Sequence, residues 1–333
     1  MTIAFITPPG QGGVKDYTDK LVEYLATEQT ATAIAWQQDS ANAVTKQALC
    51  NETLYLQYSG YGYAKRGTPL WLLQQLQSQR PQIKTLGVCF HELYALGPPW
   101  GSAFWLSPAQ RHIARRLAEL SDFWITNREE SAQWLRRFAG DKPHAVLPVF
   151  SNVGEMPVYF YQRLPKIVVF GGAALRLKTY RAAGDKFFVW AKQQGLEIHD
   201  VGSTISDPLW SKRLTAEGVL VHGRLPETEI SRLLADAMFG LVVYPVEYVA
   251  KSGVFAAYCA HGVCPVLISR QYPSTDGLLQ NRHYLAGIPE TVWTPSVAAD
   301  IGLTAWSWYQ PHRLASHAVT LNNLLGRGVN NVS

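Results

Sequence analysis

The strongest candidate for a ligand site is a charged segment that follows the apolar run Phe239–Tyr244. Directly before an apolar stretch with helical spacing come Lys251, Ser252 and Gly253. Lysine supplies a positive point charge, serine a hydroxyl, and a helix start supplies backbone N–H groups that have no intrahelical acceptor. Such groups bind phosphate, and α/β sheets place ligands at the carboxyl ends of their strands. The segment predicts a phosphate site; the alternative is that Ser252 merely caps a helix and Lys251 is solvated.

Two other side chains at strand ends have types that suit proton transfer or sugar binding. The apolar run Lys84–Phe90 ends at His91, and the loop before Lys251 contains Glu247. An imidazole can hydrogen-bond a sugar hydroxyl or move a proton, and a carboxylate can accept hydrogen bonds from sugar or ribose hydroxyls. We expect His91 and Glu247 to be catalytic residues, and a hydrogen-bonded structural role for His91 is the alternative.

Three glycine-containing turns also follow apolar runs. Gly10–Gly13 lets backbone N–H groups approach an anion, but it matches neither the GxGxxG fingerprint nor a Walker loop, so a plain strand-to-helix turn is equally open. Gly171–Lys178 carries the cations Arg176 and Lys178, which a diphosphate would require. At Val221–Leu225, backbone groups could read the edge of a nucleobase.

These residues lie on an alternating series of predicted strands and helices. The first half has strands at 2–7, 34–36, 53–58, 84–90, 123–126 and 144–147, and helices at 14–26, 69–79, 107–120 and 128–138. The second half has strands at 166–170, 197–201, 219–222, 239–244 and 264–268, and helices at 181–194, 228–237, 253–261 and 303–325. Helix 107–120 is expected to begin with Ser107 as its cap and Pro108 in its first turn. Repeated strand–helix units predict parallel, doubly wound sheets.

A stretch with little periodicity, 151–165, separates the two series and is the expected linker. The length of 333 residues also fits two domains of ordinary size. We therefore expect one Rossmann-like domain at 1–155 and a second Rossmann-like domain at 160–304. A C-terminal helix at 305–327 is expected to pack back on the first domain.

Composition and charge limit the class of protein. Hydrophobic residues make up 47% of the chain and charged residues 17%, which is typical of a compact globular protein. The net charge of +5 is not packed into one basic run, which disfavours a nucleic-acid partner but suits an anionic small ligand or peripheral contact with acidic lipid.

The cysteines and the apolar runs indicate a location. None of the four cysteines (Cys50, Cys89, Cys259, Cys264) forms a CxxC pair, and Cys89 and Cys259 are expected to be buried. This pattern fits a reducing cytoplasm. No apolar run reaches the length of a membrane span, and the N-terminus lacks the basic start of a signal peptide. We expect a cytoplasmic protein, with peripheral contact at the inner membrane as an option.

The order of these motifs resembles the GT-B glycosyltransferases, in particular the family 4-like group of glycosyltransferase families 1 and 4. Members open with a strand, a Gly-Gly loop and a helix, as in Pro8–Val14, and carry a cleft-facing histidine where His91 stands. Their second domain has a G-x-L turn, matched by Gly223–Leu225, and ends in a motif matched by Ser252–Val266. The resemblance implies two Rossmann-like domains that face each other across a cleft. It makes 1–155 the acceptor-side domain and 160–304 the nucleotide-sugar donor domain.

The resemblance also implies roles for individual residues. His91 would contact the transferred sugar or the acceptor, and Glu247 would stand for the first of two glutamates that retaining members place eight residues apart. The implied donor-binding residues are Gly12, Gly13, Arg176, Lys178, Gly223, Leu225, Lys251, Ser252 and Gly253. The second glutamate is missing, because position 255 is Phe, and alignment on Gly262 places it at Ala257. Retention or inversion and the identity of the donor therefore stay open.

The implied activity is transfer of a hexose from a UDP- or GDP-sugar to a hydroxyl of a sugar, a lipid-linked molecule or a small molecule. No D-x-D motif occurs, which disfavours the metal-dependent GT-A class, so no metal and no cofactor are expected. Two alternatives remain: a degenerate protein that binds a nucleotide sugar without turnover, and a GT-B sugar-nucleotide epimerase, which would need more acids facing the sugar.

Overall fold

The computed structural model describes residues 2–10, 12–27, 30–37, 53–95, 100–290 and 294–330. Cys50 lies outside these ranges, while Cys89 and Cys259 are buried as predicted. By its internal contacts the chain divides into two compact units. Unit 1 comprises Met1–Pro148 together with Leu314–Ser333, and unit 2 comprises Val149–Arg313. The division precedes the stretch expected as a linker, and residues 305–313 belong to unit 2 by this criterion.

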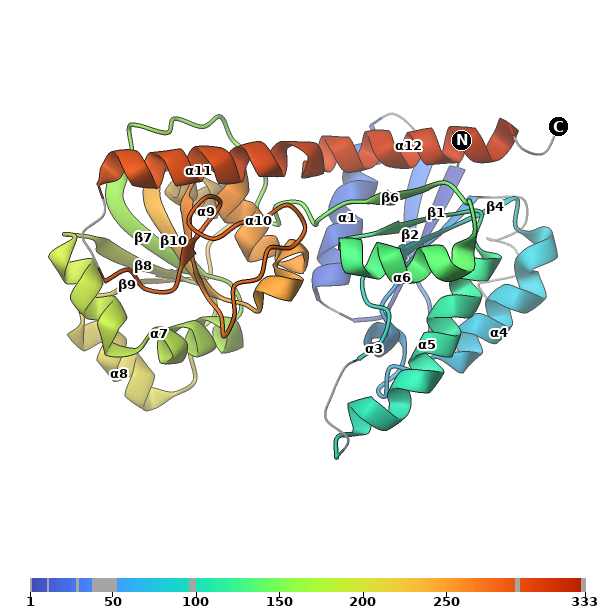
Figure 1. The fold of residues 1–333 in the computed structure, drawn as a ribbon, viewed down its shortest axis with the longest axis horizontal. Helices are drawn as coiled ribbons and strands as arrows, with labels where there is room; N and C mark the ends of the chain where they lie inside the picture. Colours follow the sequence, from blue (N-terminus) through green and yellow to red (C-terminus); the bar gives the residue numbers. More distant parts are fainter. Residues whose placement is uncertain are drawn as a thin grey trace. The chain divides into compact units, whose positions relative to one another are not determined.

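Unit 1 is built on a parallel sheet with the strand order β2-β1-β3-β4-β5-β6 (Figure 1). The strands are β1 (Thr2–Thr7), β2 (Thr30–Ala35), β3 (Thr53–Tyr58), β4 (Thr85–Phe90), β5 (Phe123–Thr126) and β6 (His144–Val146). The helices are α1 (Gly13–Leu25), α3 (Gly60–Tyr63), α4 (Leu70–Gln79), α5 (Ser102–Leu120), α6 (Glu129–Ala139) and α12 (Leu314–Asn330), with the short turn η1 (Arg80–Gln82). The order reverses between β1 and β3, so their carboxyl ends flank a topological switch point.

Strand alternation divides the core of unit 1 between the two faces of its sheet. Leu54 and Leu56 of β3 belong to a buried cluster that also contains Leu72 of α4, Ile113 of α5 and Leu135 of α6. Every residue of β3 and β4 is buried, as expected for parallel strands covered on both faces. The carboxyl edge of the sheet is therefore the place where strand residues can meet a ligand.

Unit 2 contains a second parallel sheet, in the order β12-β11-β10-β7-β8-β9. Its strands are β7 (Leu164–Phe170), β8 (Glu197–Val201), β9 (Leu220–Gly223), β10 (Ala237–Val243), β11 (Cys264–Ile268) and β12 (Leu285–Ala286). Its helices are α7 (Ala173–Gln193), α8 (Pro208–Ala216), α9 (Glu227–Asp236), α10 (Gly253–Ala260) and α11 (Pro295–Tyr309), with the short turns η2 (Val246–Lys251) and η3 (Gln310–His312). Here the order reverses between β7 and β10. The prediction of two doubly wound parallel sheets is confirmed.

Two helix starts differ from the prediction. The helix α5 begins at Ser102, so Ser107 is not its cap and Pro108 lies inside the helix. Proline removes the N–H that would bond to the carbonyl of Phe104, but Phe104 lies on an exposed turn where water can replace that bond. The helix α7 begins at Ala173, eight residues earlier than predicted, and bends at Gly184, whose φ is 61°. Arg176 therefore lies within the helix and not in the glycine turn.

The prediction of one helix over 303–325 is wrong. The chain forms α11 and α12 with the turn η3 between them, and Pro311 stands in that turn. Proline disfavours helical backbone at the residue before it and cannot donate the next hydrogen bond, so the helix ends there. The sequence analysis also missed α8, although Asp207 accepts hydrogen bonds from the backbone N–H groups of Leu209 and Trp210 and Pro208 stands in the first turn.

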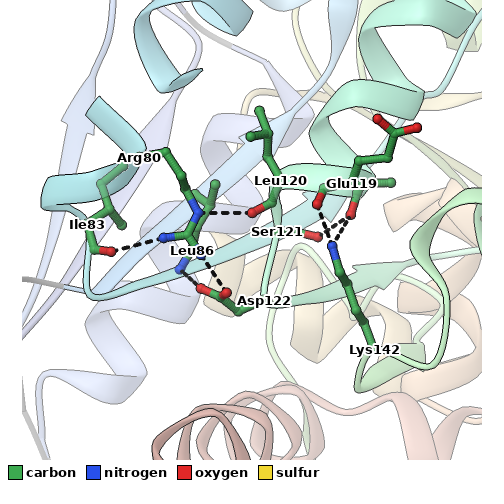
Figure 2. Close-up of polar contacts among 9 residues, drawn as sticks. Arg80, Ile83, Leu86, Glu119, Leu120, Ser121, Asp122 and Lys142 are labelled. Atoms are coloured by element: carbon green, nitrogen blue, oxygen red, sulfur yellow. Dashed lines mark hydrogen bonds and ion pairs between the residues drawn. The ribbon is translucent and has the colours of Figure 1, made fainter. Parts of the chain in front are cut away.

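A polar network fixes the end of α5 at the amino edge of the unit 1 sheet (Figure 2). Nζ of Lys142 donates to the carbonyl oxygens of Ala118, at 3.0 Å, and Glu119, at 2.6 Å, which are among the last carbonyls of the helix. Arg80 donates to the carbonyl of Leu120 and pairs with Asp122 at 2.5 Å. The network lies at the edge opposite to the strand ends that face a ligand, which indicates a structural role.

Candidate functional site

The switch point of unit 2 brings together two helix starts that suit an anion. After β7 the chain turns through Gly171 and Gly172 into α7, and after β10 it passes through η2 into α10. A Cβ atom placed on Gly171 would lie 3.4 Å from Cγ2 of Val254, so the glycine turn and the first turn of α10 lie next to each other. Neither α7 nor α10 has an acidic residue in its first turn. Free N–H groups and positive helix ends therefore lie close together at this point, and neither first turn carries a competing carboxylate.

The start of α10 is held by its own cap. The hydroxyl oxygen of Ser252 accepts a hydrogen bond from the N–H of Phe255 at 3.2 Å, and Ser252 is buried. The cap satisfies one of the first N–H groups of the helix and leaves the serine hydroxyl hydrogen available to donate. Gly253, the first helical residue, is half-buried. The predicted cap is confirmed, and it is compatible with a phosphate at the helix start.

The loop η2 presents two charged side chains beside α10. Its apolar residues Val246, Val249 and Ala250 are buried and anchor it, and the carbonyl of Ala250 accepts a hydrogen bond from the N–H of Val149. Glu247 and Lys251 remain half-buried. Nζ of Lys251 lies 5.9 Å from the ring centroid of Tyr248. A fixed loop therefore carries Lys251, Ser252 and Gly253 to the switch point as the sequence predicts.

Arg176 takes a different place from the one its sequence position suggested. Its guanidinium pairs with the carboxylate of Asp200, and each side chain is 1% exposed. The same guanidinium donates to the carbonyl oxygens of Gly171, at 3.0 Å, and Ser203. Tyr180 donates to the second oxygen of Asp200 at 3.0 Å, and burial, with Asp200 next in effect, holds the Tyr180 pKa well above its ordinary value. Arg176 therefore connects the ends of β7 and β8 through Gly171, Asp200 and Ser203.

The close approach of β7 and β8 also depends on Gly202. A Cβ atom there would lie 2.2 Å from the carbonyl oxygen of Gly171 and 2.7 Å from Nε of Arg176, which are distances that real side chains do not adopt. Gly172 differs, because a Cβ atom there would meet nothing within 4 Å and its φ is −62°. The glycine turn thus has a packed side against β8 and an open side at Gly172.

Other predicted donor residues lie apart from this turn. Lys178 is an exposed residue of α7, more than one helical turn beyond its start. Gly223 ends the edge strand β9 with φ of 72°, and its carbonyl accepts a hydrogen bond from the N–H of Gly202 at 2.8 Å. Leu225 follows and is half-buried. Gly223 is therefore connected to the carboxyl edge through Gly202, two strands away from the switch point.

The corresponding loop of unit 1 is exposed. Gly12 and Gly13 precede and begin α1, and a Cβ atom at either position would meet nothing within 4 Å. The first turn of α1 contains Asp16, whose exposed carboxylate already lies at the positive end of the helix. By this electrostatic comparison the start of α1 is less suited to a phosphate than the starts of α7 and α10.

The strand end of β4 orients two neighbouring residues in different ways. His91 is 7% exposed, and its Nε2 lies 2.8 Å from Oε1 of the buried Gln57. The His91 ring also packs edge-on against the ring of Tyr17, with 5.0 Å between centroids. Glu92, in contrast, is exposed and accepts a hydrogen bond from Ser59 at 2.9 Å. The residue that the edge of unit 1 presents to solvent is therefore Glu92.

Glu92 is the residue that the sequence analysis passed over. It stands beside His91 at the same strand end, and Ser59 follows β3, the neighbouring strand. The sequence signal was present, since a carboxylate and a hydroxyl at adjacent parallel strand ends are expected to meet at one edge. Which of two adjacent residues faces inward could not be deduced, because it depends on the Gln57 partner.

Among the described residues, no group of three or more His, Cys, Asp or Glu side chains is arranged to hold a metal ion. In the same ranges, no helix is long and apolar enough to cross a membrane.

Comparison with known proteins addresses the architecture. No protein-family model and no curated protein sequence matches the chain. A solved structure assigned as a UDP-N-acetylglucosamine 2-epimerase from Listeria monocytogenes matches with a TM-score of 0.58 and 10% identity, over 97% of this chain and 94% of that one. The lipopolysaccharide outer core galactosyltransferase WaaB matches with a TM-score of 0.54 and 10% identity, over 98% and 99%. The chain has the GT-B fold.

A third match is to a longer protein, of which this chain spans only part. The pneumococcal O-GlcNAc transferase GtfA, solved in complex with UDP and GlcNAc, matches with a TM-score of 0.52 and 11% identity over 88% of this chain. The chain spans 59% of the length of that protein. Identities this low show a shared GT-B architecture, with its two Rossmann-like sheets, and they leave the chemistry to the residues of the site.

Proposed function

We propose that the protein is a glycosyltransferase that binds the diphosphate of a UDP- or GDP-sugar at the switch point of unit 2. The observation that carries this proposal is the close approach of the Gly171–Gly172 turn to the first turn of α10, where two helix starts without acidic residues lie next to each other. This position agrees with the general preference of open α/β sheets for ligands at the carboxyl ends of their strands, beside the switch point. The family 4-like relationship is part of this proposal, and the motif order supports it.

The chemistry assigned to this site is stabilisation of a leaving group. The bond between the anomeric carbon and the diphosphate oxygen breaks, and a bond from that carbon to the acceptor hydroxyl oxygen forms. Negative charge grows on the diphosphate, and Lys251, the Ser252 hydroxyl and the N–H groups of α10 would stabilise it without a metal ion. Glu247, on the same loop, would accept hydrogen bonds from the sugar or ribose. Lys178, Gly223 and Leu225 are kept as outer donor contacts, whereas Arg176 is proposed only as a brace.

The acceptor hydroxyl must also lose a proton. In unit 1, Glu92 is an exposed carboxylate held by Ser59 at the carboxyl edge of the sheet, so we assign it this proton. His91, buried against Gln57 and Tyr17, would hold the end of β4 in place and thereby position Glu92. Gly12 and Gly13 would lie at the same edge of the sheet. The proposed acceptor is a hydroxyl of a sugar, a lipid-linked molecule or a small molecule.

A second candidate function is sugar-nucleotide epimerisation. The sequence leaves it open, and a solved structure assigned to that activity shares the fold over nearly the whole of both chains. An epimerase and a transferase would share the proposed diphosphate site and differ in their product: the first releases a rearranged sugar nucleotide, the second releases the free nucleoside diphosphate. A protein that only binds the donor would release neither.

The proposal is tested by calorimetry of the full chain with UDP, GDP and their sugar adducts, followed by analysis of the products. The variant Gly172→Leu places a side chain on the open side of the turn, where no atom lies within 4 Å of the new Cβ. We expect it to fold normally and to bind nucleotide at least about tenfold more weakly. The matched control is Gly326→Leu in α12, another position with nothing within 4 Å of the added Cβ.

Each result bears on one claim. Failure of the native protein to bind any nucleotide would refute both the transferase and the epimerase. Unchanged nucleotide affinity in Gly172→Leu would show that the diphosphate does not bind at the switch point between β7 and β10. Release of UDP or GDP supports the transferase, a rearranged sugar supports the epimerase, and binding without either product indicates the degenerate protein.

A further inference from the structure

Unit 2 contains a cavity of about 300 Å³ at the opposite end of α10 from the proposed diphosphate site. Its first wall is the segment 155–158, which precedes β7. Its second wall is formed by Trp306, Tyr309 and Arg313, which follow one another at helical spacing along α11, η3 and the residue after η3. Ala260, the last residue of α10, also lines the cavity. All of these residues belong to unit 2.

A buried tyrosine holds the first wall in place. The hydroxyl of Tyr309 donates to Oε1 of Glu155 at 2.6 Å and accepts a hydrogen bond from the N–H of Ser151 at 2.9 Å. Burial, with the carboxylate of Glu155 next in effect, raises the pKa of Tyr309 above its ordinary value, so the hydroxyl keeps the proton that it donates. The carboxylate of Glu155 is therefore fixed at the cavity by a donor from the core.

Close packing of the residues that follow connects the two walls. A Cβ atom on Gly262, just after α10, would lie 2.5 Å from Cγ1 of Val158 and 2.6 Å from Cε1 of Phe160, so only glycine allows this approach. The ring of Phe160 meets the ring of Trp306 edge to face, with 5.8 Å between centroids. In agreement with these contacts, the segment between β6 and β7 runs along α11 in Figure 1. Both walls are in place before a ligand arrives, which lowers the entropy cost of binding.

The side chains around the cavity combine apolar surface with separate hydrogen-bond donors and acceptors. Trp306 is half-buried, and Met156, which also lines the cavity, is exposed. Glu155 offers a carboxylate that accepts hydrogen bonds, and Arg313 offers a guanidinium that donates them. In the part of the chain that the structure describes, Arg313 has no ion pair. Because the charges of Glu155 and Arg313 are opposite, a ligand with a net charge gains little here.

We propose that this cavity binds a single pyranose ring of a neutral sugar. A pyranose has C–H groups on its ring faces, which can pack on the indole of Trp306, and hydroxyls around its rim, which donate and accept hydrogen bonds. Ligand pockets range over roughly 300–1,000 Å³, so the volume of this cavity suits one ring and not a nucleotide. An acyl chain would use neither Glu155 nor Arg313. The proposal goes beyond the transferase reaction, because the cavity shares no lining residue with the proposed diphosphate site.

The test is saturation-transfer NMR of the full chain with the methyl glycosides of glucose, galactose and N-acetylglucosamine, with and without excess UDP. We expect at least one glycoside to bind and its signal to persist when UDP is added. The variants Trp306→Leu and Arg313→Ala should each bind that glycoside at least about tenfold more weakly. The controls Tyr159→Leu and Arg232→Ala change exposed residues of unit 2 that do not line the cavity, and they should bind as the native chain does.

Each outcome decides for or against the cavity. Arg313 is exposed, so Arg313→Ala should keep the native unfolding midpoint and tests the site even if Trp306→Leu loses stability. Failure of the native chain to bind any of the three glycosides would overturn the proposal, and so would equal binding by the native chain and Arg313→Ala. Displacement of the glycoside by UDP would assign the sugar to the switch point instead. Binding of a free amino acid such as leucine but of no glycoside would indicate a zwitterionic ligand and would exclude the neutral sugar.

Discussion

The hydroxyl of Tyr17 lies 2.8 Å from Nδ1 of His317, a residue 300 positions later in the chain. The other ring nitrogen of His317 lies 3.0 Å from the carbonyl oxygen of Pro148. A neutral imidazole that accepts from Tyr17 and donates to Pro148 satisfies both contacts. The pair joins α1 to α12, which lie side by side in Figure 1, and thereby attaches the end of the chain to the first helix of unit 1.

The Tyr17–His317 contact can be tested with Tyr17→Phe. The change keeps the ring and leaves a buried imidazole nitrogen without its donor, so we expect a loss of about 1–3 kcal/mol in the free energy of unfolding. Urea denaturation measures the loss, and Tyr24→Phe, at an exposed position of α1, serves as control. Equal stability of the two variants would show that α12 is not held through this hydroxyl.

The buried pair of Arg176 and Asp200 predicts a larger effect. Arg176→Met leaves the carboxylate of Asp200 buried without its partner, which typically costs about 3–5 kcal/mol of stability. The double variant Arg176→Met/Asp200→Leu removes both charges and should recover much of that loss. Arg181→Met, also in α7, breaks an exposed pair with Asp207, the cap of α8, and should cost far less. If the double variant were less stable than Arg176→Met, the buried charge would not be the cause.

His261 predicts a dependence of stability on pH. It is fully buried, with Nδ1 at 2.8 Å from the carbonyl of Ala257 and Nε2 at 2.5 Å from the Ser231 hydroxyl, and burial lowers its pKa to about 4. As the pH falls, the folded state thus takes up this proton only at a lower pH than the unfolded state, in which the pKa of histidine is 6.5. Its contribution is present above pH 6.5 and is lost as the pH falls towards 4, by up to about 1.4 kcal/mol per pH unit.

The prediction is tested by comparing His261→Gln with the native chain. Unfolding in urea is followed at several pH values between 4 and 7, because the folded and unfolded pKa values of His261 lie in this range. The variant should show a shallower fall of stability with acid, although His312, whose pKa burial also lowers to about 4, retains part of the slope. His112→Gln, at an exposed position, should leave the slope unchanged. Parallel curves for native and His261→Gln would refute the assignment.

Lys251 is expected to contribute to nucleotide affinity. Lys251→Ala removes the cation beside the start of α10 and should weaken UDP or GDP binding by about 1–3 kcal/mol, the scale of a charge-assisted hydrogen bond. Calorimetry at low and high salt measures the change. Lys186→Ala, at an exposed position of α7, provides the control for a loss of one positive charge. An unaltered affinity in Lys251→Ala would remove this residue from the proposed site.

Glu92 is expected to affect turnover more than binding. Glu92→Gln preserves the size of the side chain and its acceptor for Ser59 but can no longer take up a proton at that position, so release of nucleoside diphosphate should slow by about 10²–10⁴-fold. UDP affinity should stay as in the native protein. Glu23→Gln, an exposed residue of α1, controls for the change of charge. Full activity of Glu92→Gln would assign the proton elsewhere.

The sequence by itself determined the local elements and their order. Apolar runs predicted the strands β1, β3, β4 and β5 closely, because a strand buried on both faces needs such a run. The same patterns predicted the Ser252 cap at the start of α10, which depends only on neighbours in the chain. The repeated strand–helix order predicted the two parallel sheets, whereas the GT-B fold was expected only from the resemblance.

Only the tertiary structure decided what individual side chains do. The sequence predicts Arg176 as a diphosphate ligand, but in the structure it pairs with Asp200 on another strand. It predicts that His91 faces a ligand, but Gln57 and Tyr17 enclose its side chain. Such contacts join residues far apart in the sequence, and periodicity carries no information about them, because it reports which face is buried and not what that face meets.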